Sequence, residues 1–354
     1  MPLGRDFPPA PRPEVSVKEI GERARSLHRQ AIVVDGTSFF CQGWHERLET
    51  AGVTALQLTV PWDGECARQA IGRCAEYFAL VRREPRLTIV ESVEEIRKAK
   101  AEGKVGLILA SQDGSILESD PNLVEIFYRI GFRVIQLTYN DRNLLGDGCH
   151  EAANAGLSRL GVEMIQAMNR VGMVLDLSHV GERTSLEAIE VSSKPVLFSH
   201  SNPRARADSV RNISDEQIAK CAASGGVIGA TPYAPITWTG GEKPPDLDDF
   251  VGHVEHIAGL AGVDHVSFGS DSEATPGAYP RELLRRLFST HTDSIAAFRE
   301  AHPGIFLTEG FESMEALPQL TEKLLARGWP EGDIRKLLGE NLLRVYAANW
   351  SESL

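Results

Sequence analysis

Two histidines follow short apolar runs in the middle of the chain, and their type and placement indicate a metal site. Gly172-Met-Val-Leu-Asp-Leu-Ser-His179 and Pro195-Val-Leu-Phe-Ser-His200 both end in Ser-His, and a later apolar run ends in Asp271. Neutral imidazoles donate a lone pair to a metal such as Zn²⁺, and a carboxylate beside them binds the metal or takes a proton from its bound water. The alternative is a capped core residue at each strand end, but three residues at equivalent places favour a shared site.

The apolar runs alternate with helix-like segments, which explains how distant residues come together. The runs that we predict as strands cover residues 31–36, 53–60, 105–110, 132–139, 172–179, 195–200, 225–231 and 265–271. Helical spacing separates them, for example at residues 66–82 and 182–191. Parallel strands deliver their carboxyl ends to one rim, so the pattern predicts a (β/α)₈ TIM barrel. A doubly wound open sheet also alternates, but candidate residues from both halves of the chain favour a closed barrel.

The length of 354 residues fits one large α/β domain. We expect residues 1–354 to form a single barrel domain, with an extended, proline-rich N-terminal arm at about 1–16 and C-terminal helices at about 280–354. Ser214-Asp-Glu-Gln217 is typical of a capped helix start.

Composition excludes several kinds of partner. The formal net charge of −12 argues against nucleic acid and against an anionic membrane. The polar N-terminal residues predict neither a signal peptide nor a membrane span, and five cysteines without a close CxxC pair favour the reducing cytoplasm. No GxGxxG or P-loop fingerprint supports a nucleotide cofactor.

Several segments carry a resemblance to a known family. They resemble, in the same order, signature segments of the membrane (renal) dipeptidase family, peptidase family M19, a branch of the metal-dependent, amidohydrolase-like barrels. The match runs from the first strand to Gly339-Glu-Asn-Leu-Leu-Arg344, which is most of the chain. The segments are Val174-Leu-Asp-Leu-Ser-His179, Phe198-Ser-His-Ser201, Val210-Arg-Asn-Ile213, Gly225-Gly-Val227 and Gly269-Ser-Asp271.

The resemblance implies an activity and roles for individual residues. Members of that family hold two zinc ions that share a hydroxide, which attacks the amide of a dipeptide. By resemblance, His179 and His200 bind the second metal, and Asp271 is the catalytic group that holds the proton taken from the water. Arg211 grips the substrate's carboxylate, a role that suits the bidentate fork of arginine, although a lone arginine is more often a surface charge. Since relatives are often dimers, a homodimer is one expected state.

The sequence departs from the family at the first metal. The family's Asp-Gly-His-x-Asp, whose His and Asp bind that metal, is Asp35-Gly-Thr-Ser-Phe39 here. The glutamate that bridges the two metals falls at Gln112, and a one-place shift would put Asp113 there instead. A family histidine after the fourth strand is matched by Tyr139, which we assign to substrate binding.

Charge decides what these changes mean. A two-zinc centre carries four positive charges, and without both carboxylates the first site has almost no stabilisation. We therefore expect at most one zinc per chain, on His179 and His200 with Gln112 or Asp271, and an empty site stays open. Loop residues after the first and fourth strands are weaker candidates for replacement ligands, and Cys149 is also a weak candidate nucleophile. These loop residues are Cys41, His45, Cys149, His150 and Glu151.

Three functions remain open from the residues alone. The first is a dipeptidase-family hydrolase that acts on a dipeptide or related small carboxylate-bearing amide. The second is a metal-independent lyase or isomerase on the same barrel that uses Asp271 and Tyr139. The third is a non-catalytic protein that binds a small acid through Arg211. Four aromatic residues are candidates to line the pocket or merely to pack: Trp44, Trp62, Tyr233 and Trp238.

Overall fold

The computed structural model describes residues 20–39, 45–61, 63–272 and 294–350, in which strands and helices alternate. The strands are β1 (Val34–Ser38), β2 (Ala55–Thr59), β3 (Leu87–Ile89), β4 (Val105–Ser111), β5 (Phe132–Gln136), β6 (Val174–Asp176), β7 (Leu197–Phe198), β8 (Val227–Ala230) and β9 (Val266–Phe268). The helices are α1 (Glu22–Gln30), α2 (His45–Thr50), α3 (Ala67–Arg83), α4 (Val93–Glu102), α5 (Leu123–Arg129), α6 (Arg159–Val171), α7 (Glu182–Val191), α8 (Asp215–Ala223), α9 (Ala234–Thr237), α10 (Leu247–Ala261), α12 (Ser294–Ala301), α13 (Leu317–Ala326), α14 (Glu331–Arg335) and α15 (Asn341–Asn349).

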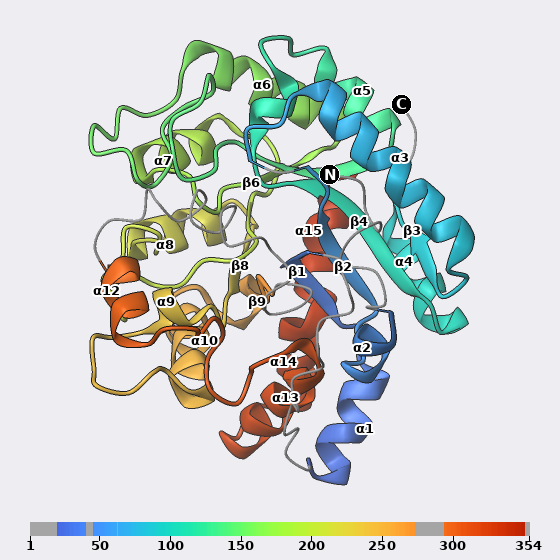
Figure 1. Cartoon of the computed structure of the whole chain (residues 1–354), viewed down its shortest axis with the longest axis vertical. Helices are drawn as coiled ribbons and strands as arrows, with labels where there is room; N and C mark the ends of the chain where they lie inside the picture. Colours follow the sequence, from blue (N-terminus) through green and yellow to red (C-terminus); the bar gives the residue numbers. More distant parts are fainter. Residues whose placement is uncertain (1–19, 40–44, 62, 273–293, 351–354) are drawn as a thin grey trace.

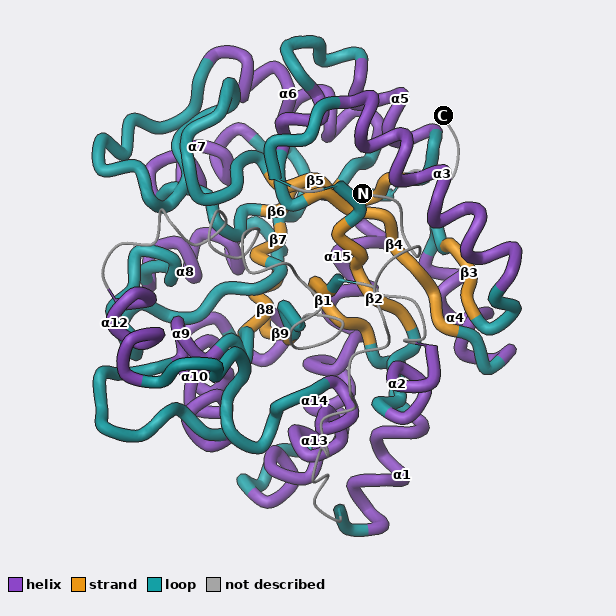
Figure 2. The backbone as a smooth tube through the Cα atoms, viewed as in Figure 1, coloured by secondary structure: helices purple, strands orange, loops and turns teal. Residues whose placement is uncertain are grey.

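Eight of these strands form a closed parallel ring. Their order is β1-β2-β4-β5-β6-β7-β8-β9, and β3 pairs with β4 off this path. The ring closes where Ser38 bridges Ser272 in parallel and the Asp271 N–H donates to the Thr37 carbonyl at 3.0 Å. Figure 2 shows this ring surrounded by helices. The predicted (β/α)₈ barrel is therefore confirmed, and the open doubly wound sheet is wrong.

Apolar side chains fill the end of the barrel at which the strands begin, here called its base. Helix α15 closes this end and lies behind the strands in Figure 1. On α15, Tyr346 also donates a hydrogen bond to Gln57 Oε1 at 3.3 Å. Because strand side chains alternate between faces, residues two and four places beyond the base also point inwards, and most of them are polar. The barrel is thus apolar at its base and polar towards the carboxyl ends of its strands. The base residues that cluster with α15 are Val34, Ala55, Ile108, Val134, Val174, Leu197 and Val227.

Outward-facing strand residues pack against the surrounding helices. Leu56, Leu107 and Ile135 are fully buried in one large cluster with residues of these helices. Burial of each such side chain stabilises the fold by roughly 1.5–3 kcal/mol. Since both faces of every strand are covered, the ring is held rigidly and its rim can position side chains.

The elements lie where the sequence predicts them, but several strands are shorter than the predicted runs, and the C-terminal helices differ. Ser214 caps α8 through a capping box with Gln217, as the sequence indicates. The predicted C-terminal helices are interrupted at residues 302–313, which form a loop. Gly304 and Gly310 lie there with φ of 86° each, a left-handed conformation that ends helices. The arm at 1–16 and residues 280–293 lie outside the described part of the chain.

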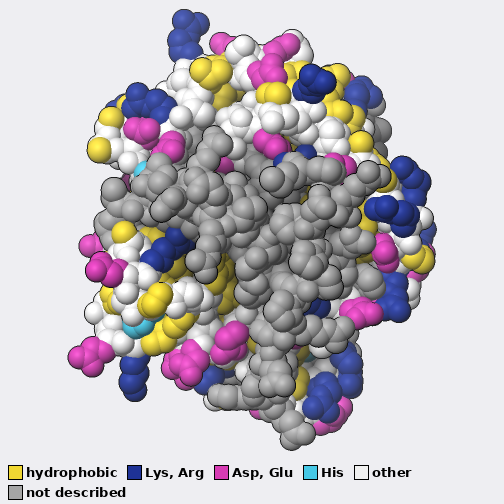
Figure 3. Space-filling model, viewed as in Figure 1, with side chains coloured by type: hydrophobic (Ala, Val, Ile, Leu, Met, Phe, Trp, Pro, Cys, Tyr) yellow, Lys and Arg dark blue, Asp and Glu magenta, His cyan; other side chains and the backbone are white. Residues whose placement is uncertain are grey.

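Charged side chains are distributed over the described surface without a basic patch on the face drawn in Figure 3, where dark blue and magenta groups alternate. Many of them pair, as Arg327 does with Asp248 and Glu255. Within the described ranges, no helix combines the length and the apolar character needed to cross a bilayer.

Candidate active site

Two buried imidazoles meet at the rim of the barrel. His179 and His200 follow β6 and β7, and their Nε2 atoms lie 2.9 Å apart. Their ring centroids are 4.9 Å apart, and the side chains are 7% and 0% exposed. His179 has a φ of 65°, a left-handed conformation that is strained for a residue with a Cβ atom. The barrel therefore holds the two rings edge to edge, with an angle of 56° between their planes, even though this costs backbone strain.

The other nitrogen of each ring has a partner that fixes its proton. His179 Nδ1 lies 2.7 Å from Asn140 Oδ1, and His200 Nδ1 lies 2.7 Å from Ser199 Oγ. The Ser199 hydroxyl donates to Asp176 Oδ2 at 2.5 Å. An amide oxygen only accepts, and a hydroxyl has one proton, so both Nδ1 atoms are the donors. The Nε2 lone pairs of both rings therefore point at one another.

Two lone pairs 2.9 Å apart repel each other unless both bind a cation. A proton fits on the line between the two nitrogens, whereas a zinc ion, about 2.0–2.1 Å from each nitrogen, fits only to one side of that line. Burial first, and the charge of Arg211 second, lower the pKa of His200 well below its ordinary value. The ring of His200 is therefore neutral near pH 7. The ring of Tyr139 stacks on His179, with centroids 4.1 Å apart and an angle of 21° between the planes.

Arg211 brings a fixed positive charge to this rim. Its Nη2 donates to the His200 carbonyl at 2.8 Å, and its Nη1 donates to Ser201 Oγ at 3.1 Å. The side chain is 4% exposed. These bonds employ two of the five N–H donors of a guanidinium. The structure thus brings Arg211 next to the histidine pair.

Asp271 lies at the ring closure, after β9, and is the fourth polar residue of this group beside His179, His200 and Arg211. It has a φ of 48°. Burial raises the pKa of Asp271 to about 7, while Arg211 lowers it and Asp35 raises it. Burial, and next the charge of Asp271, raise the pKa of Tyr139 well above its ordinary value. Asp271 can therefore take or release a proton near neutral pH, and Tyr139 stays a hydrogen-bond donor.

Gln112 and its neighbour Asp113 have different environments. Gln112 Nε2 donates to Thr59 Oγ1 at 2.8 Å, and Gln112 Oε1 is buried with no hydrogen-bond partner among the described residues. Asp113 accepts from the Gly64 N–H at 3.0 Å and from Asn143 Nδ2 at 2.8 Å. Asp113 therefore holds loops together, whereas Gln112 keeps a buried oxygen without a hydrogen-bond partner among the described residues.

Comparison with known proteins identifies the family. The profile described as Membrane dipeptidase (Peptidase family M19) matches residues 61–284 and 301–352. The chain belongs to the membrane dipeptidase family. The resemblance inferred from the sequence segments is thus confirmed at the level of the family.

Three relatives of this M19 chain illustrate the range of similarity. An amidohydrolase from Pseudomonas aeruginosa is 33% identical, with a TM-score of 0.84 over 93% of this chain and 99% of that one. A metallo peptidase from Rhodobacter sphaeroides, liganded with a phosphinate mimic of the dipeptide L-Ala-D-Ala, shares the fold at 19% identity and a TM-score of 0.75, covering 91% and 100%. Dipeptidase tcpJ from Claviceps purpurea is 27% identical over 264 residues, which are 73% of this chain and 55% of that protein. The chain thus spans about half the length of this curated relative.

Near the residues that the resemblance assigns to a first metal, the Asp35 carboxyl accepts all its hydrogen bonds from protein groups. Asp35 is fully buried, and it accepts from the Ser270 N–H at 2.7 Å and from the Ser270 hydroxyl at 2.6 Å. The Thr37 N–H donates to the same carboxyl at 3.3 Å. Within the described ranges, no group of three or more His, Cys, Asp or Glu side chains is arranged to hold a metal ion.

Among the described candidates for replacement ligands, Cys149 and Glu151 have hydrogen-bond partners other than the two imidazoles. Cys149 Sγ lies 3.6 Å from Asn140 Oδ1, so it contacts a neighbour of His179. Glu151 instead accepts from the Arg142 N–H at 3.0 Å. Cys41, Trp44, Trp62 and the side chain of His45 lie outside the described part of the chain.

Of the two described aromatic candidates, Trp238 packs against its neighbours, whereas Tyr233 lies close enough to Tyr139 to contribute to the raised pKa of that residue. Trp238 donates to the Gly241 carbonyl at 2.9 Å, and its ring packs edge-on against Phe298 of α12. The Tyr233 hydroxyl accepts from Arg299 at 2.7 Å. Three residues that orient the histidines were not predicted from the sequence. Their only sequence signal is that polar residues interrupt or follow apolar runs. These residues are Asn140, Asp176 and Ser199.

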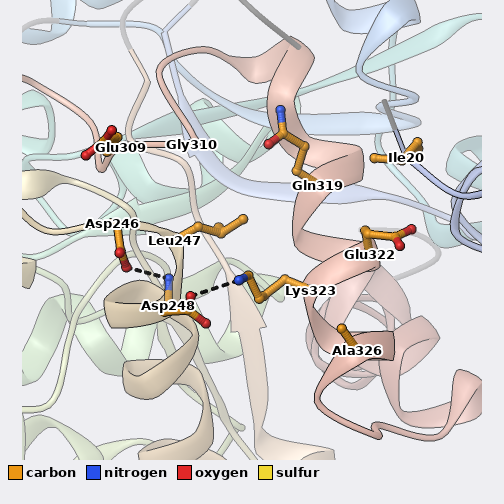
Figure 4. A pocket seen from close by; sticks show the side chains of 10 residues that line it. All are labelled: Ile20, Asp246, Leu247, Asp248, Glu309, Gly310, Gln319, Glu322, Lys323 and Ala326. Carbon is orange, nitrogen blue, oxygen red and sulfur yellow. Dashed lines mark hydrogen bonds and ion pairs between the residues drawn. The ribbon is translucent and has the colours of Figure 1, made fainter. Parts of the chain in front are cut away.

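A separate groove of about 380 Å³ lies between α13 and the start of α10 (Figure 4). Lys323 and Asp248 form an ion pair across it at 2.8 Å. The groove shares no residue with the barrel mouth, where His179, His200 and Arg211 lie.

Proposed function

We propose that this M19 chain hydrolyses a dipeptide or a related small carboxylate-bearing amide, at a metal centre reduced to at most one ion. The observation that carries the proposal is the 2.9 Å approach of the His179 and His200 Nε2 atoms, whose lone pairs face one another. Membership of a dipeptidase family supports the reaction class, and the Rhodobacter relative that binds a phosphinate dipeptide mimic supports the substrate class.

The residues present fit one zinc ion. His179 and His200 supply two nitrogen donors, and the buried, unpartnered Gln112 Oε1 is an oxygen donor of suitable type. Three protein ligands and one water suffice for a catalytic zinc. When bound, such an ion acts as a Lewis acid that lowers the pKa of its water.

The residues present do not fit the family's first ion. Phe39 and Thr37 offer no anionic or imidazole donor, and Gln112 is neutral. Asp35, the nearest carboxylate in sequence, already accepts three hydrogen bonds from protein groups. Because little negative charge remains to offset a second divalent cation, we assign no step of the reaction to it.

The chain's own groups bind the substrate and handle the proton. Arg211 pairs with the substrate's carboxylate, since a buried guanidinium beside the histidine pair recognises a planar anion. Tyr139 donates a hydrogen bond to the substrate. Asp271 accepts the proton released by the attacking water, and a pKa of about 7 suits a group that later returns that proton.

The test measures zinc and turnover together. The full chain is stripped with a chelator and reloaded, its zinc is counted by mass spectrometry, and a dipeptide panel is assayed. We expect at most one zinc per chain, and we expect His200→Ala to lose both zinc and turnover. His256→Ala is the matched control, because His256 pairs with Asp215 away from the rim.

Two results would contradict the proposal. Two zinc ions per chain would show that the first site is intact, and turnover that survives His200→Ala would exclude a metal-bound nucleophile. If the metal-free chain binds a small acid and Arg211→Ala abolishes that binding while no turnover is found, the chain is a binding protein instead.

A further inference from the structure

A buried chain of hydrogen bonds runs from Asp176 to His200. The Asp176 carboxyl accepts from the Ser178 N–H and the Ser199 N–H, each at 3.0 Å, through Oδ1. Its Oδ2 accepts from the Ser199 hydroxyl at 2.5 Å, and the same hydroxyl oxygen lies 2.7 Å from His200 Nδ1. Asp176 is 1% exposed, and Ser199 and His200 are fully buried.

The chemistry of these groups determines the direction of every bond. Burial raises the pKa of Asp176, and its hydrogen bonds with Ser199 and Ser178 act to lower it. In its ionised form the carboxyl only accepts, so the single hydroxyl proton of Ser199 points at Asp176. The hydroxyl oxygen then has only lone pairs to offer to His200. The hydrogen bond to the ring therefore requires the proton on Nδ1, which leaves Nε2 with its lone pair.

We propose that Asp176 and Ser199 are positioning residues that hold His200 in its Nδ1–H tautomer and so aim the Nε2 lone pair at the point shared with His179. The first part of this proposal is a statement about the protein alone. The second part, that the lone pair receives a metal ion, rests on the proposed function. A partner of this kind orients a metal-binding histidine and raises its basicity.

The barrel contains a matched arrangement that lacks a histidine. Asp35 accepts from the Ser270 N–H at 2.7 Å and from the Ser270 hydroxyl at 2.6 Å, as Asp176 does from Ser199. The Ser270 hydroxyl lies 2.9 Å from Ser272 Oγ rather than near a ring nitrogen. A change at Asp35 therefore removes a buried carboxylate of the same kind without touching the bonds of His200.

Asp176→Asn reverses the direction of the hydrogen bonds from residue 176 to His200 without changing the shape of the side chain. The two backbone N–H groups require an acceptor, so the asparagine oxygen must take the Oδ1 position. Its NH₂ group then faces Ser199 and donates to the hydroxyl oxygen. The hydroxyl proton must turn towards His200 Nδ1, which forces the proton of the ring onto Nε2. The lone pair at the shared point is thereby lost.

The experiment reads the tautomer directly. Full-length, ¹⁵N-labelled, metal-free chain is studied by long-range ¹H–¹⁵N correlation, which distinguishes a protonated ring nitrogen from a bare one, with His200→Ala used only for assignment. We expect His200 as Nδ1–H in the wild type and in Asp35→Asn, and as Nε2–H in Asp176→Asn. An Nε2–H wild type, or the same tautomer in wild type and Asp176→Asn, would overturn the proposal.

A second variant and a zinc titration separate the two parts of the proposal. Ser199→Ala removes the acceptor, so His200 should show a mixture of tautomers; a single Nδ1–H form in this variant would count against the role of Ser199. Titration of Zn²⁺ into the metal-free chains should give an affinity about 10–100-fold weaker for Asp176→Asn than for Asp35→Asn. If the wild type shows the expected tautomers but binds no zinc, the positioning role of Asp176 and Ser199 is upheld and the proposed metal-dependent hydrolase is refuted.

Discussion

Replacement of Asp35 by Asn should make the protein more stable at alkaline pH and leave it unchanged at acid pH. Asp35 is fully buried on β1, and its three hydrogen bonds come from Ser270 and Thr37. Burial raises the pKa of Asp35 to about 7, although its hydrogen bonds with Ser270 and Thr37 act to lower it. The folded protein therefore resists the charge that the unfolded chain accepts readily.

The magnitude follows from the two pKa values. An Asp in an unfolded chain has a pKa of about 3.9, so the difference from about 7 is about 3 units, or on the order of 4 kcal/mol. Well below a pH of about 3.9 the carboxyl is protonated in both the folded and the unfolded state, so Asp35 does not reduce stability there. As pH rises from about 4 to about 7, the unfolded state loses its proton first, so the free energy of unfolding falls. Above pH 7 the loss is complete.

Urea unfolding at pH 4.5 and pH 8 tests this reasoning. The free energy of unfolding of Asp35→Asn, relative to the wild type, should be greater by about 2–4 kcal/mol at pH 8 than at pH 4.5. Asp208→Asn, at an exposed carboxylate, controls for the loss of one negative charge. If the variant and the wild type differ in free energy of unfolding by the same amount at both pH values, the claim that the folded protein disfavours the charged form of Asp35 is refuted.

Three further outcomes are expected. Arg211→Lys should raise KM about tenfold in steady-state kinetics, because Lys lacks the planar fork, and an unchanged KM would remove Arg211 from substrate binding. Wild-type kcat/KM should rise with pH through about 7 as Asp271 loses its proton, and Asp271→Asn should lower it about 100-fold or more. Gly229→Ala should cost roughly 3 kcal/mol in urea unfolding, because its Cβ atom would overlap the Ser199 carbonyl.

The barrel could be predicted from the sequence because its strands are buried on both faces. Such strands are short, nearly continuous apolar runs, and Val105-Gly-Leu-Ile-Leu-Ala110 became β4 almost unchanged. The run at 172–179 was predicted as one strand, but β6 ends at Asp176. The difference arises because the Ser-His residues leave the ladder, and His179 adopts a left-handed backbone that a strand pattern cannot reveal.

The histidine pair could be predicted, but its supporting residues could not. His179 and His200 were identifiable because their residue type and their position at strand ends agree. Asp176 and Ser199 lie inside predicted strands, where polar residues are ambiguous without knowledge of the neighbouring strand. Their role depends on which atom donates to which, and that becomes visible only when β6 and β7 lie side by side.

The hydrogen bonds of the polar half of the barrel separate groups that position from groups that bind. The carboxyls of Asp35 and Asp176 each accept three hydrogen bonds from the protein, so their bonding capacity is used in holding neighbours. Gln112 Oε1 has no such partner among the described residues, and the Nε2 atoms of His179 and His200 lie 2.9 Å apart. Buried polar atoms without partners cost free energy unless something completes them. Gln136 Oε1 and Thr138 Oγ1 in the same half of the barrel are also without partners among the described residues, so a missing partner does not by itself identify a ligand. Under the proposed function, the ion would be held where Gln112 Oε1 and the two Nε2 lone pairs are available, and the satisfied carboxylates of Asp35 and Asp176 would keep their neighbours in place.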